Sequence, residues 1–147
     1  MKIAEELLIL AREHHLSLSL GNKAVNTAKS KNIANIKVLC LEIAQTFGSS
    51  FQAHFETEEV TIFAPLKQKS ATLNILCEQL TKEHQQLYQM AIALKDKHEL
   101  LAEFGTLLKA HTRAEDRDLF PNINLLSKAQ RQAIKTSSEK HLPVTKL

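Results

Sequence analysis

The chain has 147 residues, a length that predicts one domain with its own hydrophobic core. Its 19 basic and 16 acidic residues leave a formal net charge of only +3, scattered along the sequence, which argues against a nucleic-acid-binding protein. Leu, Ala, Lys, Glu and Gln dominate, whereas Gly and Pro occur three times each and Trp is absent, so the composition predicts an all-α fold.

The two cysteines lie far apart in apolar stretches. We therefore expect Cys40 and Cys77 to be reduced core residues rather than a zinc site or a redox pair. Charged residues interrupt the apolar run of the first twenty residues, and no cleavage signal follows, so a helix is expected there instead of a signal peptide. No apolar stretch is long enough to span a bilayer. We expect a cytoplasmic protein with no membrane partner.

The first helix is predicted over residues 3–25, because apolar residues recur there three or four apart, with His14 in the middle of the apolar face. Gly21 and Asn22 are expected to bend or interrupt it. The polar residues 26–32 are expected to form the connection to the next helix.

The second helix is predicted to start near Ile33 and, given Pro65, to end near 66–68. The Gly-Ser-Ser sequence at 48–50 is expected to kink or locally widen this helix. A short linker at 67–71 is expected to follow.

The third helix is predicted from Leu73 to Leu94 and ends in the charged run 95–98. The fourth is predicted over 100–119 and is expected to be closed by Pro121.

A short fifth helix is predicted at 127–137 with Ser127 as its N-cap, and 138–147 is expected to be a loosely attached tail. Four long helices with short connections predict an antiparallel up-and-down four-helix bundle. We assign its core to 1–123 within a single domain that spans 1–147, the remainder being the short helix and tail.

One sequence motif occurs twice, at 54–65 and at 111–121. Each copy reads His, three residues, Glu, a second acid, then an apolar residue, Phe and Pro. Residues i and i+4 of an α-helix lie one turn apart on the same face, so His54 with Glu58, and His111 with Glu115, can point at one place.

Each predicted long helix carries one histidine within its apolar face. A buried ionised Glu costs several kcal/mol unless it is compensated, and a metal ion compensates it well, with neutral imidazoles as partners. A single such His or a single His-x-x-x-Glu is usually structural, but four histidines and two motif copies favour a metal site. The predicted ligands are His14, His54, Glu58, His84, His111 and Glu115.

These motifs resemble the hemerythrin-like, or HHE cation-binding, family. The matching segments are EHH (13–15), HFETEEVTIFAPL (54–66), KEHQQL (82–87) and HTRAEDRDLFPNI (111–123). The resemblance implies a non-haem di-iron centre in the bundle core, with two iron ions held by the four histidines and bridged by Glu58, Glu115 and an oxo or hydroxo group. Zinc or another divalent metal is compatible with such donors in purified protein, because they bind Zn²⁺ and Cu²⁺ more tightly than Fe²⁺.

Four imidazoles and two carboxylates exceed what one tetrahedral ion can use, yet fall short of the roughly twelve bonds that two octahedral ions form. Two such ions would therefore keep open coordination positions for a small ligand. We expect a protein that binds or senses O₂, NO or iron itself. The alternatives are a di-iron oxidoreductase acting on peroxide, O₂ or ferrous iron, and a helical interaction module with a metal-free polar core. The sequence does not indicate an oligomeric state. It contains no other catalytic motif, so a dedicated enzyme is not expected.

Two positions leave alternatives open. Oxygen-carrying hemerythrins have a second His one turn after the third-helix His, where this chain has Tyr88. For Tyr88 we favour a hydrogen bond near the site, or packing, over ligation, and its presence argues against reversible O₂ storage. His15 is the alternative first-helix ligand if the helical phase is one residue off.

Several neighbours of the predicted ligands are expected to have supporting roles. Glu59 and Asp116 are expected to face solvent or to contact the ligands from outside. Glu13 and Glu83 are expected on a solvated face, with orientation of the adjacent histidine as the alternative.

Four other side chains lie at the ends of predicted elements. His98 and His141 are expected on the surface, because both are in polar segments. Phe63 and Phe120 are expected to close the bundle end against water.

Overall fold

The computed structural model describes residues 3–141, and within that range the regular structure is entirely helical, without strands. The prediction of an all-α fold is confirmed. Its long helices are α1 (Leu8–Lys29), α2 (Ile33–Thr57), α4 (Ala71–Ala93) and α5 (Leu101–Ala114). Nowhere in residues 3–141 does a helix combine the length and the apolar character needed to cross a bilayer.

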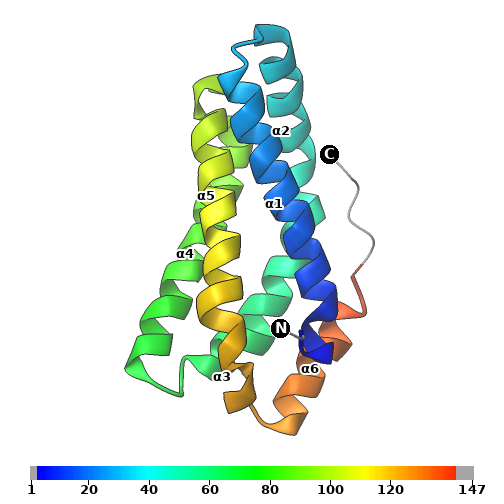
Figure 1. The fold of residues 1–147 in the computed structure, drawn as a ribbon, viewed down its shortest axis with the longest axis vertical. Coiled ribbons are helices and arrows are strands. Elements are labelled where there is room, and N and C mark those ends of the chain that lie inside the picture. The colour runs from blue at the N-terminus through cyan, green and yellow to red at the C-terminus, as the bar shows by residue number, and fades with distance from the viewer. Residues whose placement is uncertain (1–2, 142–147) are drawn as a thin grey trace.

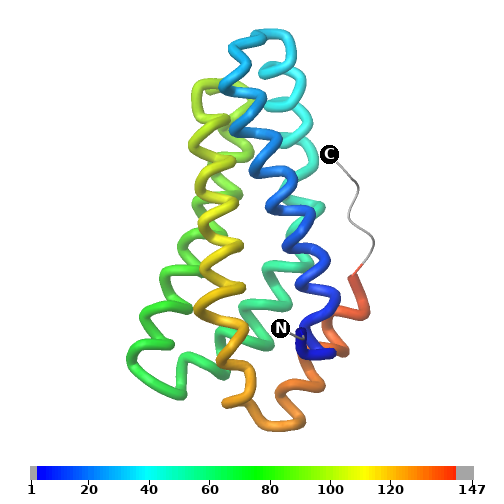
Figure 2. Tube along the Cα trace, viewed as in Figure 1, coloured from blue at the N-terminus to red at the C-terminus, as the bar shows by residue number. Residues whose placement is uncertain are grey.

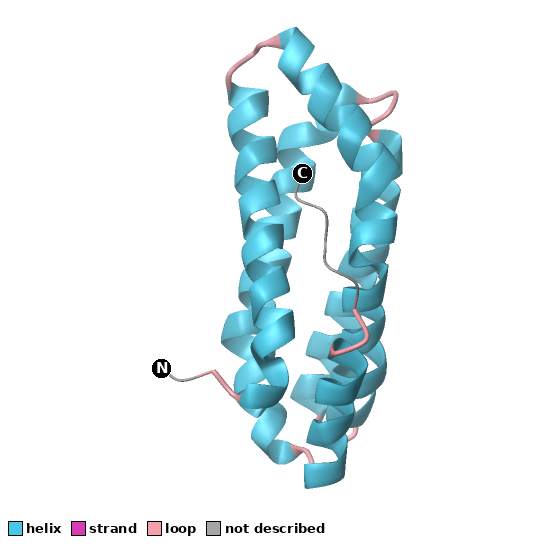
Figure 3. Ribbon diagram, turned by 90° about the vertical axis from the view of Figure 1, so that its right-hand side faces the viewer, coloured by secondary structure: helices cyan, strands magenta, loops and turns pink. Residues whose placement is uncertain are grey.

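The four long helices lie side by side (Figures 1 and 3). Helix α1 packs against α2 and α5, and α4 packs against the same two helices, so the four surround a common core. The connections 30–32 and 94–97 lie at one end of the bundle, and 67–70 lies at the other (Figure 2).

The hydrophobic core consists of two clusters placed one after the other along the bundle. One cluster includes Leu20, Phe47 and Phe104, and the other includes Leu10 and Phe63. Along α1, His14 falls between the residues of the two clusters. The polar side chains described below are therefore enclosed by apolar layers on both sides.

Three helices begin with a side-chain cap. Asn32 accepts a hydrogen bond from the backbone of Asn35, and Ser70 does the same at the start of α4. Ser127 caps α6 (Lys128–Ser138) and forms a capping box with Gln130. The predicted fifth helix and its N-cap are confirmed.

Gly21 does not interrupt α1, which was one of the two predicted effects. A 3₁₀ turn at Glu5–Leu7 precedes α1, which then continues through Gly21 to Lys29. The predicted connection at 26–32 shrinks to 30–32, where Lys31 adopts a left-handed conformation with φ 56°. The glycine serves packing instead, because a Cβ at Gly21 would lie 3.0 Å from the carbonyl oxygen of Gly105 on α5.

The predicted kink at 48–50 is also wrong, since α2 stays α-helical there. The helix widens ten residues later, in a π-helical segment at Glu58–Phe63, before the short α3 (Ala64–Leu66). A second π-helical segment, Glu115–Leu119, follows α5. Both begin at a predicted metal ligand, and π-helical turns are frequent at functional sites.

The end of the fourth helix differs from the prediction. Pro121 does not close an α-helix but lies in the first turn of a 3₁₀ helix, Phe120–Leu125, which follows the second π segment. Of the predicted loose tail, residues 138–141 are placed against the bundle, and 142–147 lie outside the described residues.

Candidate metal centre

All six predicted ligands are buried and converge in the middle of the bundle. Each histidine is at most 2% exposed, and both Glu side chains belong to residues that are 0% exposed. Each long helix contributes one histidine, and each π-helical segment starts with one of the two carboxylates. The predicted convergence of the six side chains is found.

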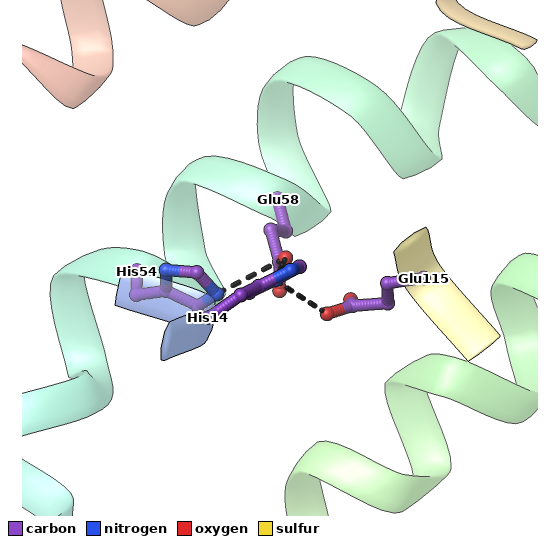
Figure 4. A group of neighbouring side chains, drawn as sticks. All are labelled: His14, His54, Glu58 and Glu115. Atoms are coloured by element: carbon purple, nitrogen blue, oxygen red, sulfur yellow. Dashed lines mark hydrogen bonds and ion pairs between the residues drawn. The ribbon is translucent and has the colours of Figure 1, made fainter. Parts of the chain in front are cut away.

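The six side chains form two groups of four that share both carboxylates. One group contains His14 and His54, the other His84 and His111, and Glu58 and Glu115 belong to both; the donor atoms of each group lie within 4.8 Å of one another. Figure 4 shows the first group, in which the two imidazoles and the two carboxylates point toward one another.

In the first group, each histidine presents Nε2 to a carboxylate oxygen. His14 Nε2 lies 3.2 Å from Glu58 Oε2 and 3.1 Å from Glu115 Oε1. His54 Nε2 lies 3.1 Å from Glu58 Oε2.

The second group uses the opposite oxygen of each carboxylate. His84 Nε2 lies 3.2 Å from Glu58 Oε1 and 3.8 Å from Glu115 Oε2. His111 Nε2 lies 3.4 Å from Glu115 Oε2. Each carboxylate therefore directs one oxygen to each histidine pair.

An outer ring of four carboxylates fixes the orientation of the histidines. Each Nδ1–H donates to one of them: His14 to Asp116 at 2.7 Å, His54 to Glu13 at 2.9 Å, His84 to Glu59 at 2.6 Å and His111 to Glu83 at 2.8 Å. A proton held on Nδ1 leaves the Nε2 lone pair directed into the site, as metal-binding histidines require.

The sequence prediction for Glu13 and Glu83 is thus corrected. Neither is on a solvated face, and neither orients the histidine next to it in sequence; each accepts from a histidine on the following long helix. Glu59 and Asp116 contact the predicted ligands His84 and His14 from outside, which was one of the two expected arrangements. The signal in the sequence was an acid directly beside four of the six ligands.

Several buried polar atoms of the site have no hydrogen-bond partner among the described residues: Glu58 Oε1, His84 Nε2, His111 Nε2 and both side-chain oxygens of Glu115. A buried polar atom without a partner costs about 1–3 kcal/mol, and more if it is charged. Imidazole lone pairs that face carboxylate oxygens also repel unless a proton or a cation lies between them. The donor set and its unpartnered atoms fit a metal site.

The pKa values show how strongly the site favours positive charge. Burial lowers the pKa of His84, but the nearby carboxylates of Glu115, Glu58 and Glu59 outweigh this effect and raise it to about 11. Burial opposes the negative charge of Glu115 too, as does the charge of Glu58, yet His111 and His14 lower its pKa to about 2. Protons and metal cations therefore compete for the same buried space.

Aromatic rings cover the imidazoles. Phe55 stacks on His84 with ring centroids 3.8 Å apart, and Phe63 lies 5.5 Å from the same ring. Phe120 stacks on His14 at 5.0 Å. Phe63 and Phe120 belong to one apolar cluster, next to the site, as their predicted role in excluding water requires.

The structure decides between His14 and His15 and shows how Tyr88 packs. His15 is exposed, so His14 is the histidine of α1 that faces the site. Tyr88 is half-buried and packs edge-on against Phe47 and Phe55. Burial, together with the nearby Glu59, raises the pKa of Tyr88 to about 12.

His141 is a residue that the sequence analysis misplaced. His98 is partly exposed, close to the prediction, but the side chain of His141 is only 5% exposed and contacts Glu13 and Thr57. Its polar surroundings in the sequence carried no periodic signal that could have shown this. Cys40 and Cys77 are buried free thiols, as predicted.

A cavity of about 520 Å³ lies against His14 and Asp116, where α1 meets the 3₁₀ helix Phe120–Leu125. Its walls are mainly apolar and include Leu7 and Ile123. Open space therefore reaches the hydrogen-bonded pair that flanks one side of the site.

The chain matches a known protein family. The family model described as the hemerythrin HHE cation binding domain matches residues 7–123, which contain all six converging side chains. No curated protein and no solved structure matches the chain significantly.

Proposed function

The chain belongs to the hemerythrin HHE cation-binding domain family, and from this premise we propose that it is a non-haem di-iron protein that binds or senses a small ligand such as O₂, NO or iron itself. We propose that the chain forms a single domain, built as an antiparallel up-and-down four-helix bundle. Its proposed metal ligands are His14, His54, Glu58, His84, His111 and Glu115.

One observation carries the proposal: both buried carboxylates are shared between two histidine pairs. Glu58 directs Oε2 to His14 and His54 and Oε1 to His84. A single cation would leave half of these donors unused and buried, at the cost already described. Two cations use all of them.

The donor count leaves room for a ligand. Four imidazole nitrogens and four carboxylate oxygens supply eight of the roughly twelve positions of two octahedral ions. When bound, two irons would supply open coordination positions and a reversible change of oxidation state. The chain's own part is to hold the donors rigidly through the outer carboxylates and to exclude water with Phe55, Phe63 and Phe120.

The identity of the metal as iron is argued from the family, because these donors alone bind Zn²⁺ and Cu²⁺ at least as well. The test is to load metal-free protein with Fe²⁺ under anaerobic conditions, admit air, and record iron content and ferric charge-transfer absorption. We expect two irons per chain in the wild type and loss of the pair in Glu58→Gln. Glu56→Gln is the matched control, since Glu56 is in the same motif but is exposed and accepts a hydrogen bond from Gln52, away from the site.

The proposal is contradicted if the wild type binds iron and Glu58→Gln shows the same iron content and the same absorption.

A cytoplasmic location and the absence of a nucleic-acid partner stay predictions from the sequence.

The second candidate function, a di-iron oxidoreductase acting on peroxide, O₂ or ferrous iron, is favoured by one contact. Tyr88 packs against Phe55, which in turn stacks on His84, so an oxidisable phenol lies one ring away from a proposed ligand. If this function is right, Tyr88→Phe will slow turnover of peroxide or Fe²⁺ without changing the iron content. If the wild type turns over peroxide or Fe²⁺ no faster than a His54→Ala variant does, this function is excluded.

A further inference from the structure

His141 contacts the candidate metal centre although it lies beyond the segment that matches the family model, 7–123. Its Nδ1 lies 3.0 Å from each carboxylate oxygen of Glu13, and its Nε2 lies 2.8 Å from Thr57 Oγ1. Glu13 Oε1 also accepts from His54 Nδ1 at 2.9 Å. One carboxylate thus connects the imidazole of His54 with that of a residue at the far end of the chain.

Glu13 differs in this respect from the other three outer carboxylates. Its side chain is 9% exposed, against 18% for Glu83, 33% for Glu59 and 44% for Asp116. Only Glu13 among these four is held by a second imidazole within the described residues. The outer partner of His54 is therefore the most buried and the most constrained of the four.

Helix α6 holds His141 in this place. Ile134 and Ser138 of α6 are buried, and α6 packs against the first π-helical segment, Glu58–Phe63. Thr57, which directly precedes that segment, has its Oγ1 2.6 Å from Ser137 Oγ as well as 2.8 Å from His141. The C-terminal helix thus contacts both the outer partner of His54 and the residue before Glu58.

We propose that His141 is a positioning residue of the metal centre, which acts through Glu13 to hold the imidazole of His54. The inference rests on the proposed two-metal function. Without His141, Glu13 is free to turn away from His54, so the position formed with His14 and His54 loses its cation faster, whereas the one formed with His84 and His111 is unchanged. Removal of the outer partner of a metal-bound histidine typically lowers metal affinity 10–100-fold.

The test compares four variants in the full chain. His141→Phe keeps a planar ring but removes both hydrogen bonds, whereas His141→Asn retains an amide N–H that can reach Glu13. Ser137→Ala weakens the contact of α6 with Thr57 without touching Glu13. His98→Asn removes a histidine that contacts the backbone carbonyl of Lys95, in the 94–97 connection.

The first readout is the release of Fe²⁺ to a chromogenic chelator under anaerobic conditions. In His141→Phe, release of one of the two irons is expected to accelerate about tenfold, at the low end of the range for direct outer partners, while release of the other keeps its wild-type rate. His141→Asn restores most of the wild-type rate, and Ser137→Ala and His98→Asn release iron like the wild type.

The second readout is solvent exchange of the imidazole N–H protons, followed by their shifted NMR signals in Fe²⁺-loaded protein. The slowest-exchanging signal is expected to be that of His54, and His141→Phe is expected to remove its protection selectively. A general loosening of the bundle would instead increase the solvent-exchange rates of all the imidazole N–H protons together. That result would overturn the proposal.

The outcomes separate the two proposals. Wild-type protein that binds two irons, with His141→Phe releasing both at wild-type rates, overturns the role of His141 and leaves the proposed function intact. Wild-type protein that binds no pair of irons overturns both. Equal acceleration in Ser137→Ala and His141→Phe shows that docking of α6, not the contact with Glu13, is responsible, and this also overturns the proposal.

Discussion

Replacement of Gly105 by Ala tests how closely α1 and α5 must approach to build the site. A Cβ at Gly105 would lie 2.7 Å from the carbonyl oxygen of Gly21 and 2.9 Å from Cβ of Ala24, both on α1. Neither atom belongs to a flexible side chain, so the two helices must shift apart by several tenths of an ångström. These helices carry His14 and His111, so the shift also reaches the candidate metal centre.

Two opposing effects set the magnitude. Ala in place of Gly favours a helix by about 1 kcal/mol. Overpacking of a tight contact costs about 1–3 kcal/mol, and contact with a backbone atom places this case at the upper end. We expect Gly105→Ala to lower the free energy of unfolding by about 2 kcal/mol. Gly48→Ala, on α2 with no heavy atom within 4 Å of the added Cβ, is the matched control and is expected to raise it by up to about 1 kcal/mol.

The assay is urea unfolding of both variants and the wild type, followed by circular dichroism in the presence of a chelator, because bound metal would add its own linkage to the result. Gly105→Ala is also expected to weaken metal binding, whereas Gly48→Ala is not. The reasoning is refuted if Gly105→Ala is as stable as Gly48→Ala.

Two further predictions concern the charges of the site. Glu83→Gln removes the acceptor of His111 Nδ1–H and is expected to lower metal affinity 10–100-fold in a chelator competition, while the exposed Glu103→Gln leaves it unchanged; equal affinities would contradict the assigned role of Glu83. In metal-free protein, buried carboxylates raise the pKa of His111 to about 9 and that of His84 to about 11, against the opposing effect of burial. Their stabilising contribution is complete below the unfolded pKa of about 6.5 and is lost as the pH rises through those values. The urea midpoint of metal-free protein is therefore expected to fall between pH 6.5 and 9, whereas apparent metal affinity rises because fewer protons must leave; a metal-free protein more stable at pH 9 than at pH 6.5 would contradict this.

The inner site was predictable from the sequence because its geometry is local. His54 and Glu58 lie one helical turn apart, and so do His111 and Glu115, so spacing alone places each pair on one face. Each apolar face carries one histidine, so packing the four faces against one another brings the four histidines to a common point. The helix boundaries at Ile33 and Ser127 were predictable for a similar reason, since capping depends on neighbouring residues.

The outer contacts were not predictable because their partners lie on different helices. Glu13 adjoins His14 but bonds to His54, and no spacing rule connects these residues across two helices. The same holds for His141, whose partner is 128 residues away. Gly21 was misread because a glycine that allows close helix packing has the same local pattern as one that interrupts a helix.

In the proposed metal centre, two cations share the carboxylates of Glu58 and Glu115, and quantitative EPR of iron-loaded, air-oxidised protein, with iron counted per chain, can detect such a pair. We expect two irons per chain and almost no signal from isolated high-spin ferric ions, because two ferric ions held by the same carboxylates would couple magnetically. One iron per chain, or two irons that give the full signal of isolated ferric ions, would show that the carboxylates are not shared.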